Sequence, residues 1–156
     1  MREPEEPASP ASTIRSIRVG DFMTRDLVTL QESDDLALAE QMLRLGGMRH
    51  LPVVRSGKLV GLITHRDLLR AAIAHAPRKT SASEVMIREP TTVTVTTSLV
   101  HAARVMLAHK FGCLPVCDDE GQLVGIITES DFVRFAADMV QDLDLVAEAV
   151  SATDRA

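Results

Sequence analysis

The chain has 156 residues, about the length of one domain, and its core must be aliphatic, because 46% of the residues are apolar but none is Trp or Tyr and only four are Phe. Its formal net charge of -5 argues against a broad nucleic-acid footprint. No apolar run approaches the ~18 residues that span a bilayer, and the acidic, Pro-rich start is unlike a signal peptide, so we expect a cytoplasmic protein outside the membrane.

The first half of the chain predicts a tail followed by one mixed α/β unit. Residues 1–13 hold three prolines, three glutamates and little to bury, which is typical of a disordered tail. Residues 14–75 follow the order strand, helix, strand, strand, helix, with Ser33-Asp34-Asp35 as candidate N-caps and Gly46-Gly47 as a helix stop. The expected elements are a lead-in ending near Met23, an extended piece at 27–30, a helix from Leu36 to Leu43, a hairpin of strands at 50–54 and 59–63, and a helix at 68–74.

The second half predicts the same order again. A polar linker at 76–82 leads into residues 83–137, and the last helix continues into an extension at 138–156. The elements expected here are a strand at 91–95, a helix at 99–108, strands at 113–117 and 123–127, and a helix from Phe132 onward. The apolar stripe of that last helix has helical spacing and suits either a partner subunit or packing back onto its own domain. Its members are Phe135, Met139, Leu143 and Val146.

An internal repeat explains why the two halves agree. LPVVRSGKLVGLITHRDLL at 51–69 returns as LPVCDDEGQLVGIITESDFV at 114–133, with ten of nineteen positions identical once one residue is added in the turn before Gly121. The offset is 63 residues before that turn and 64 after it. Two half-units of this size cannot each bury a core alone, so we expect them to pack on each other.

The two cysteines, Cys113 and Cys117, do not make a disulfide framework, and no second pair is present to complete a zinc site. We expect both to be small buried hydrophobic residues.

The most informative polar residues stand where a strand passes into a helix. In the segment GLITHRD, Thr64 caps the helix and Asp67 lies three residues on, on the same side. A hydroxyl, free amides and a fixed carboxylate suit a ligand with vicinal hydroxyls and an anionic group. The alternative is that Thr-x-x-Asp is only a capping box, and duplication would then repeat it as Thr128 and Asp131.

Two copies of β-α-β-β-α with LPVV…G-x-LVG-x-IT-x-x-D, each after a V-x-D-x-M or S-x-EVM lead-in, resemble a tandem pair of CBS domains, or Bateman module. The resemblance covers about residues 19–133. It implies an α/β (α+β) fold in which two β-α-β-β-α repeats, related by a pseudo-two-fold axis, form one compact module. It also implies a regulatory sensor that binds AMP, ADP, ATP, S-adenosylmethionine or NAD in clefts between the repeats.

The same resemblance implies the ligand-binding residues, which fall at equivalent positions of the two copies. They are the ribose-binding acids Asp67 and Asp131, the hydroxyls Thr64 and Thr128, the phosphate-side Arg66 and Ser130, the base-side segments Met48-Arg49-His50 and Phe111-Gly112-Cys113, and the strand-opening Val28 and Thr91. The first copy adds His65, whereas the second has Glu129 at that position. Because basic residues gather in the first copy, we predict two unequal sites, the one at Asp67 being the tighter.

Other functions fit less well. The five histidines form no metal or catalytic motif and no Ser or Cys has a nucleophile-elbow context, so we expect no catalysis and no required cofactor. A DNA-binding regulator lacks a basic helix outside the repeats. A purely structural dimerisation module stays open as an alternative. We expect a homodimeric sensor whose change is read by an effector protein.

Overall fold

The structure, a computed structural model, describes residues 17–153 of the chain, and side-chain surroundings to residue 144. The expected tail at 1–13 and the side chain of Val146 lie outside this description. The elements in chain order are α2 (Val19–Phe22), β1 (Leu30–Gln31), α3 (Leu36–Gly46), β2 (His50–Arg55), β3 (Lys58–Thr64), α4 (His65–Ile73), α5 (Ala82–Val85), β4 (Ile87–Arg88), α6 (Leu99–His109), β5 (Cys113–Cys117), β6 (Leu123–Thr128) and α7 (Glu129–Thr153).

The first sheet has the strand order β1-β2-β3-β4. Strands β2 and β3 form the predicted hairpin around Ser56 and Gly57, both of which have positive φ, at 50° and 79°. Strand β1 runs parallel to β2, and β4 runs antiparallel to β3. The fourth strand therefore comes from the segment that follows the linker, not from the first repeat.

The second sheet has the same plan in a shorter form. Strands β5 and β6 are antiparallel, Val93 makes a parallel bridge to Val116, and Thr24 makes an antiparallel bridge to Ile126. These bridges correspond to β1–β2 and β4–β3 of the first sheet. The prediction of a strand over 91–95 is wrong in extent, because only Val93 pairs there.

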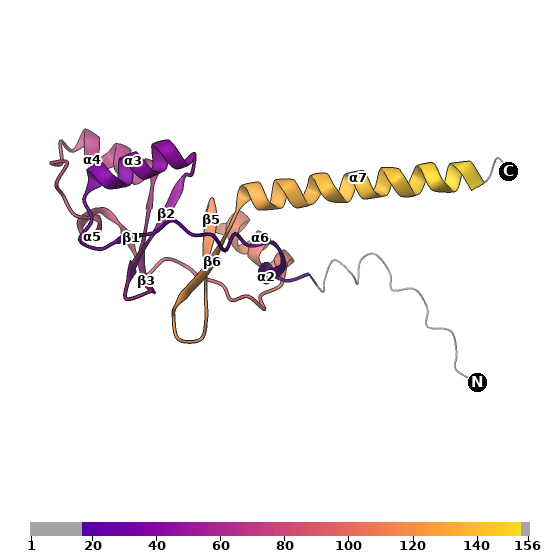
Figure 1. Ribbon diagram of the computed structural model, residues 1–156, viewed down its shortest axis with the longest axis horizontal. Helices are drawn as coiled ribbons and strands as arrows, with labels where there is room; N and C mark the ends of the chain where they lie inside the picture. Colours follow the sequence, from indigo (N-terminus) through magenta and orange to yellow (C-terminus); the bar gives the residue numbers. More distant parts are fainter. Residues whose placement is uncertain (1–16, 154–156) are drawn as a thin grey trace.

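The two lead-in segments are exchanged between the repeats. Val19 and Met23, at the start of the chain, are buried in the core of the second repeat with Leu114 and Ile127. The core of the first repeat instead takes in the second lead-in, through Ala82 and Met86, which pack with Leu51 and Ile63. Figure 1 shows the consequence, with α2 beside α6 and α5 beside β1. Each repeat is thus completed by a segment that belongs in sequence to the other.

Reciprocal hydrogen bonds show the pseudo-two-fold relation of the repeats. Leu59 N donates to Gly121 O at 3.2 Å, and the equivalent Leu123 N donates to Gly57 O at 3.1 Å, so the two hairpin turns pair with each other. The lead-ins obey the same symmetry: Val19 N donates to the carbonyl oxygen at position 97, and Ala82 N donates to that at position 34, at 2.8 and 2.6 Å. The scaffold is therefore nearly symmetric, although the side chains on it are not.

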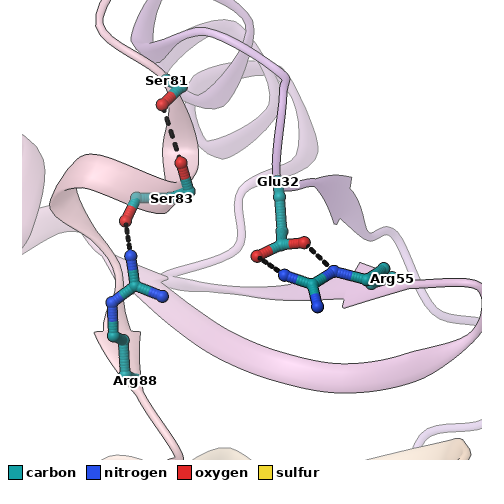
Figure 2. Close-up of polar contacts among 5 residues, drawn as sticks. All are labelled: Glu32, Arg55, Ser81, Ser83 and Arg88. Atoms are coloured by element: carbon teal, nitrogen blue, oxygen red, sulfur yellow. Dashed lines mark hydrogen bonds and ion pairs between the residues drawn. The ribbon is translucent and has the colours of Figure 1, made fainter.

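Polar contacts hold the second lead-in and the first hairpin at one edge of the first repeat (Figure 2). Arg88 donates to the main-chain oxygen of Ser83 at 2.7 Å, and the hydroxyls of Ser81 and Ser83 lie 2.8 Å apart. Beside them Arg55 pairs with Glu32 through two hydrogen bonds. The ends of β1 and β2 are thereby joined next to the segment that the second repeat contributes.

Helix α7 is much longer than its counterpart α4 and leads away from both repeats (Figure 1). Its first turns pack on the second repeat, where the ring of Phe135 meets that of Phe22 edge to face at 4.9 Å. Farther on, Val140 and Leu143 are 58% and 63% exposed. The predicted apolar stripe is therefore divided: Phe135 packs on its own repeat, whereas Leu143 is exposed. No helix within residues 17–153 is long and apolar enough to cross a membrane.

Candidate ligand-binding cavity

In both Thr-x-x-Asp segments the acid accepts two hydrogen bonds from the threonine, and in the first copy Asp67 N also donates to Thr64 Oγ1 at 3.4 Å, which completes a capping box. Thr64 donates to Asp67 Oδ2 through its backbone N at 2.9 Å and its Oγ1 at 2.6 Å. Thr128 makes the same two hydrogen bonds to Asp131 Oδ2, at 2.8 and 2.9 Å. The capping function that the sequence left as an alternative is therefore present in both copies, and it uses one carboxylate oxygen of each acid.

The other carboxylate oxygen has a weaker local partner in each copy. Both acids are buried, with Asp67 5% and Asp131 4% exposed. Asp67 Oδ1 lies 3.6 Å from Arg70 Nη1, and Asp131 Oδ1 lies 3.2 Å from Arg134 Nη1, but both arginine side chains are largely exposed. The arginine side chain of each pair is exposed and can move, so a ligand hydroxyl could share Oδ1 without breaking the hydrogen bonds to Oδ2.

A cavity of about 260 Å³ lies between the repeats. This volume is slightly below that of most small-molecule sites, which span ~300–1,000 Å³. The predicted residues that line it are Val28, Met48, Arg49 and His50 from the first repeat and Gly112, Thr128 and Ser130 from the second. The lining residues that sequence reasoning did not place in a site are Thr24, Asp26, Leu27, Gly47, Pro52, Ile126 and Glu129.

This lining corrects the premise of the sequence-based ranking. Arg49 and His50 were counted with Asp67, since all three belong to the first repeat. In the structure both lie in the cavity of Thr128 and Ser130, which precede and follow the first residue of α7. The basic residues of one repeat thus line the same cavity as the helix start of the other, which the ranking by repeat does not take into account.

The remaining predicted residues lie elsewhere. His65 lines a groove between α3 and α4, and Phe111 lines a groove between α6 and α7. Cys113 is buried in a small cluster with Leu62 and Ile126. The others are not on the lining of the cavity: Thr64, Arg66, Asp67, Thr91 and Asp131.

His50 is the titratable group most affected by this setting. Burial lowers its pKa, the nearby Arg49 and His65 lower it further, and Glu129 opposes them. The lowered pKa favours the neutral form of the imidazole. Its Nε2 lies beside Gly112, where a methyl group added to the glycine would come within 2.8 Å of it. The missing side chain at Gly112 leaves room for the His50 ring.

The missed lining residues had a partial signature in the sequence. Glu129 follows Thr128 directly, at the position of His65 in the other repeat, so its place at a helix start was readable. The segment from Thr24 to Val28 was not, because it lines the cavity only through the exchange of lead-ins.

Comparison with known proteins places the fold in a family. A family model for the CBS domain matches residues 19–74 and 82–138. Among solved structures, one named as an acetoin utilization protein (AcuB) of Vibrio cholerae is 38% identical with a TM-score of 0.78, and the match covers 83% of this chain and 98% of that chain.

Two other solved structures contain adenosine compounds. CBSX2 of Arabidopsis thaliana, in complex with AMP, is 32% identical with a TM-score of 0.71, covering 79% of this chain and 98% of that chain. The CBS domain pair of protein MJ0100, in complex with 5′-methylthioadenosine and S-adenosyl-L-methionine, is 29% identical with a TM-score of 0.72, covering 78% and 97%.

Two curated relatives are much longer than this chain. An inosine-5′-monophosphate dehydrogenase of Korarchaeum cryptofilum is 31% identical over 127 residues, which are 81% of this chain but 25% of that protein. A homoserine O-acetyltransferase of Methanohalophilus mahii is matched over 23% of its length. The chain thus spans about a quarter of each, whereas the matches to the three solved structures cover 97–98% of those chains. With two matched copies that together cover most of its length, the chain belongs to the CBS domain family, as a tandem pair.

Proposed function

We propose that this chain is a non-catalytic regulatory module that binds an adenosine-type ligand in the cavity between its two CBS repeats. Such ligands include AMP, ADP, ATP, S-adenosylmethionine and NAD. Binding changes the angle between the repeats or the packing of a homodimer, and an effector protein reads that change. No cofactor is required.

The observation that carries the proposal is that both repeats line one cavity. The first repeat contributes the base-side residues Met48 and His50, and the second contributes the hydroxyls of Thr128 and Ser130 at the start of α7. Related CBS pairs hold AMP or S-adenosylmethionine, which supports the ligand class. A ligand between two half-units contacts both, so its binding energy depends on how they are arranged.

A matched pair of threonine variants tests the cavity. Thr128 and Thr64 make equivalent caps, so replacing either with Val should cost about 0.5–2 kcal/mol of stability. Only Thr128 lines the cavity. Thermal shift and calorimetry with adenosine, AMP, ATP, S-adenosylmethionine and NAD should therefore show ligand affinity reduced in Thr128→Val and retained in Thr64→Val. An equal loss of ligand affinity in the two variants, each measured under conditions in which it is folded, would contradict this assignment.

Exposed apolar side chains on the helices support a homodimer. Leu69 and Ile73 on α4, Leu107 on α6 and Val133 on α7 are 61%, 69%, 80% and 69% exposed. A helical face this apolar is typical of a subunit interface. We expect light scattering to give twice the mass of the chain and Leu107→Glu to shift it toward the monomer; a monomeric wild-type chain at micromolar concentration would contradict the dimer.

A purely structural dimerisation module is the second candidate. It is favoured by the hydrogen bonds from Thr64 to Asp67 and from Thr128 to Asp131, which give both threonine hydroxyls a partner without any ligand. Under this alternative the same panel of adenosine compounds would leave the melting temperature unchanged at millimolar concentration, since a ligand that binds only the folded state must raise it.

A further inference from the structure

The rim of the inter-repeat cavity carries more negative than positive charge. Asp26 and Glu129 are its two carboxylates, and Arg49 is its one guanidinium. Burial and Arg49 lower the pKa of His50, which favours its uncharged form. A phosphate monoester that enters would add about two further negative charges to a lining that is already negative.

One of the two carboxylates, that of Glu129, lies where a bound phosphate would otherwise be favoured. It is the first residue of α7, where the backbone amides and the helix dipole favour an anion. In the first repeat the same position is His65, the first residue of α4, followed by Arg66 where the second repeat has Ser130. The second repeat therefore has a carboxylate where the first has basic groups. This carboxylate lies at the N-terminus of α7, the end of the helix that favours an anion.

The remaining lining is suited to the uncharged parts of a nucleoside. Val28, Met48, Pro52 and Ile126 supply apolar surface for a base, and Thr128 supplies a hydroxyl near the buried acid of its own cap. None of these contacts needs a phosphate.

From this arrangement we infer that the cavity selects an adenosine compound that lacks phosphate and is neutral or cationic at its 5′ substituent. The sulfonium of S-adenosylmethionine and the thioether of 5′-methylthioadenosine are examples of such substituents. The inference rests on the proposed function and narrows its ligand class: Asp26 and Glu129 discriminate against AMP and ATP at this site through charge.

Calorimetry on the full chain at low ionic strength tests the inference with five probes. These are adenosine, 5′-methylthioadenosine, S-adenosylmethionine, AMP and ATP. Affinity should fall from S-adenosylmethionine to AMP to ATP. Added salt should weaken the binding of S-adenosylmethionine and leave the binding of adenosine almost unchanged. In Glu129→Gln and Asp26→Asn the affinity for AMP relative to adenosine should rise about three- to tenfold, the effect of removing one like charge a few ångströms from a screened ligand.

The control variant is Glu120→Gln, which removes an exposed carboxylate from the turn before β6, outside the cavity lining. It should leave the ratio of AMP to adenosine affinity unchanged. If AMP binds as tightly as S-adenosylmethionine, or the ratio does not move in Glu129→Gln, the charge selection is refuted while adenosine binding stands. If none of the five probes binds, the proposed function itself fails.

Discussion

The exchange of lead-ins predicts that a mutation early in the chain weakens the second repeat and spares the first. Met23 is 7% exposed and belongs to the core that contains Leu114 and Ile127. It lies over Gly125, where an added methyl group would come within 2.5 Å of the Met23 sulfur. The glycine below has no side chain that could move into the vacated space, so Met23→Ala should leave a cavity.

The expected cost follows from that geometry. Buried Met→Ala substitutions cost about 2–5 kcal/mol, and the value rises with the volume that stays empty. We therefore expect about 3 kcal/mol, which corresponds to roughly 150-fold faster exchange of amides that exchange through opening of this core. The affected amides should be those of β5 and β6, which are about 90 residues or more from the mutation in sequence.

Native-state hydrogen exchange read by mass spectrometry checks this result. The matched control is Met86→Ala, since Met86 lies over Gly61 in the first repeat in the same way. It should accelerate exchange in β2 and β3 instead. Faster exchange of β2 and β3 in Met23→Ala, with β5 and β6 protected as in the wild type, would refute the exchange of lead-ins.

Three further predictions concern single residues. The lowered pKa of His50 means that the unfolded chain binds a proton at this residue more readily than the folded chain does. The free energy of unfolding should therefore decrease as the pH falls below the unfolded pKa of about 6.5, and His50 should not affect it above that pH. Urea unfolding between pH 5 and 7.5 should show this slope reduced in His50→Gln, and an unchanged slope would contradict it. Burial raises the pKa of Cys113 to about 12, so in a Cys117→Ser background a disulfide reagent at pH 8 should react quickly only in denaturant; fast reaction of the native chain would contradict the burial. Gly47 has φ +61° with nothing within 4 Å of an added methyl group, so Gly47→Ala should cost about 1 kcal/mol from backbone strain alone. Lys110, at φ +57° in the other repeat, is the control, because Lys110→Gly should not destabilise the protein. Equal urea midpoints for the wild type and Gly47→Ala would contradict this prediction.

The elements of each repeat could be predicted because their determinants are local. Asp35 caps α3 through a hydrogen bond to Leu38 N at 2.9 Å, and Gly47 ends it with a left-handed backbone. The hairpin turn at Ser56-Gly57 is fixed by two adjacent residues. The duplicated motif then predicts that whatever holds for one repeat holds for the other.

Contacts between distant segments could not be predicted in the same way. Met23 and Met86 occupy equivalent positions, so the sequence is equally consistent with each methionine packing on its own repeat or on the other. The same ambiguity placed Arg49 and His50 with Asp67, although they line the cavity of Thr128. A duplicated sequence specifies both half-units well and leaves open which half supplies each wall of the cleft between them.

The exchange also gives the cavity a direct connection to the arrangement of the repeats. Thr24 is held in the second sheet, where its N and O both pair with Ile126 at 2.9 and 3.0 Å, and six residues later Leu30 is in β1 of the first sheet. The chain between them crosses from one sheet to the other, and Asp26, Leu27 and Val28 on this crossing line the cavity. A ligand in the cavity would therefore contact a segment whose two ends are fixed in different sheets. Six residues at full extension span only about 20 Å, so a change in the distance between the sheets must alter the conformation of this segment. We therefore expect ligand affinity to depend on the distance between the two sheets.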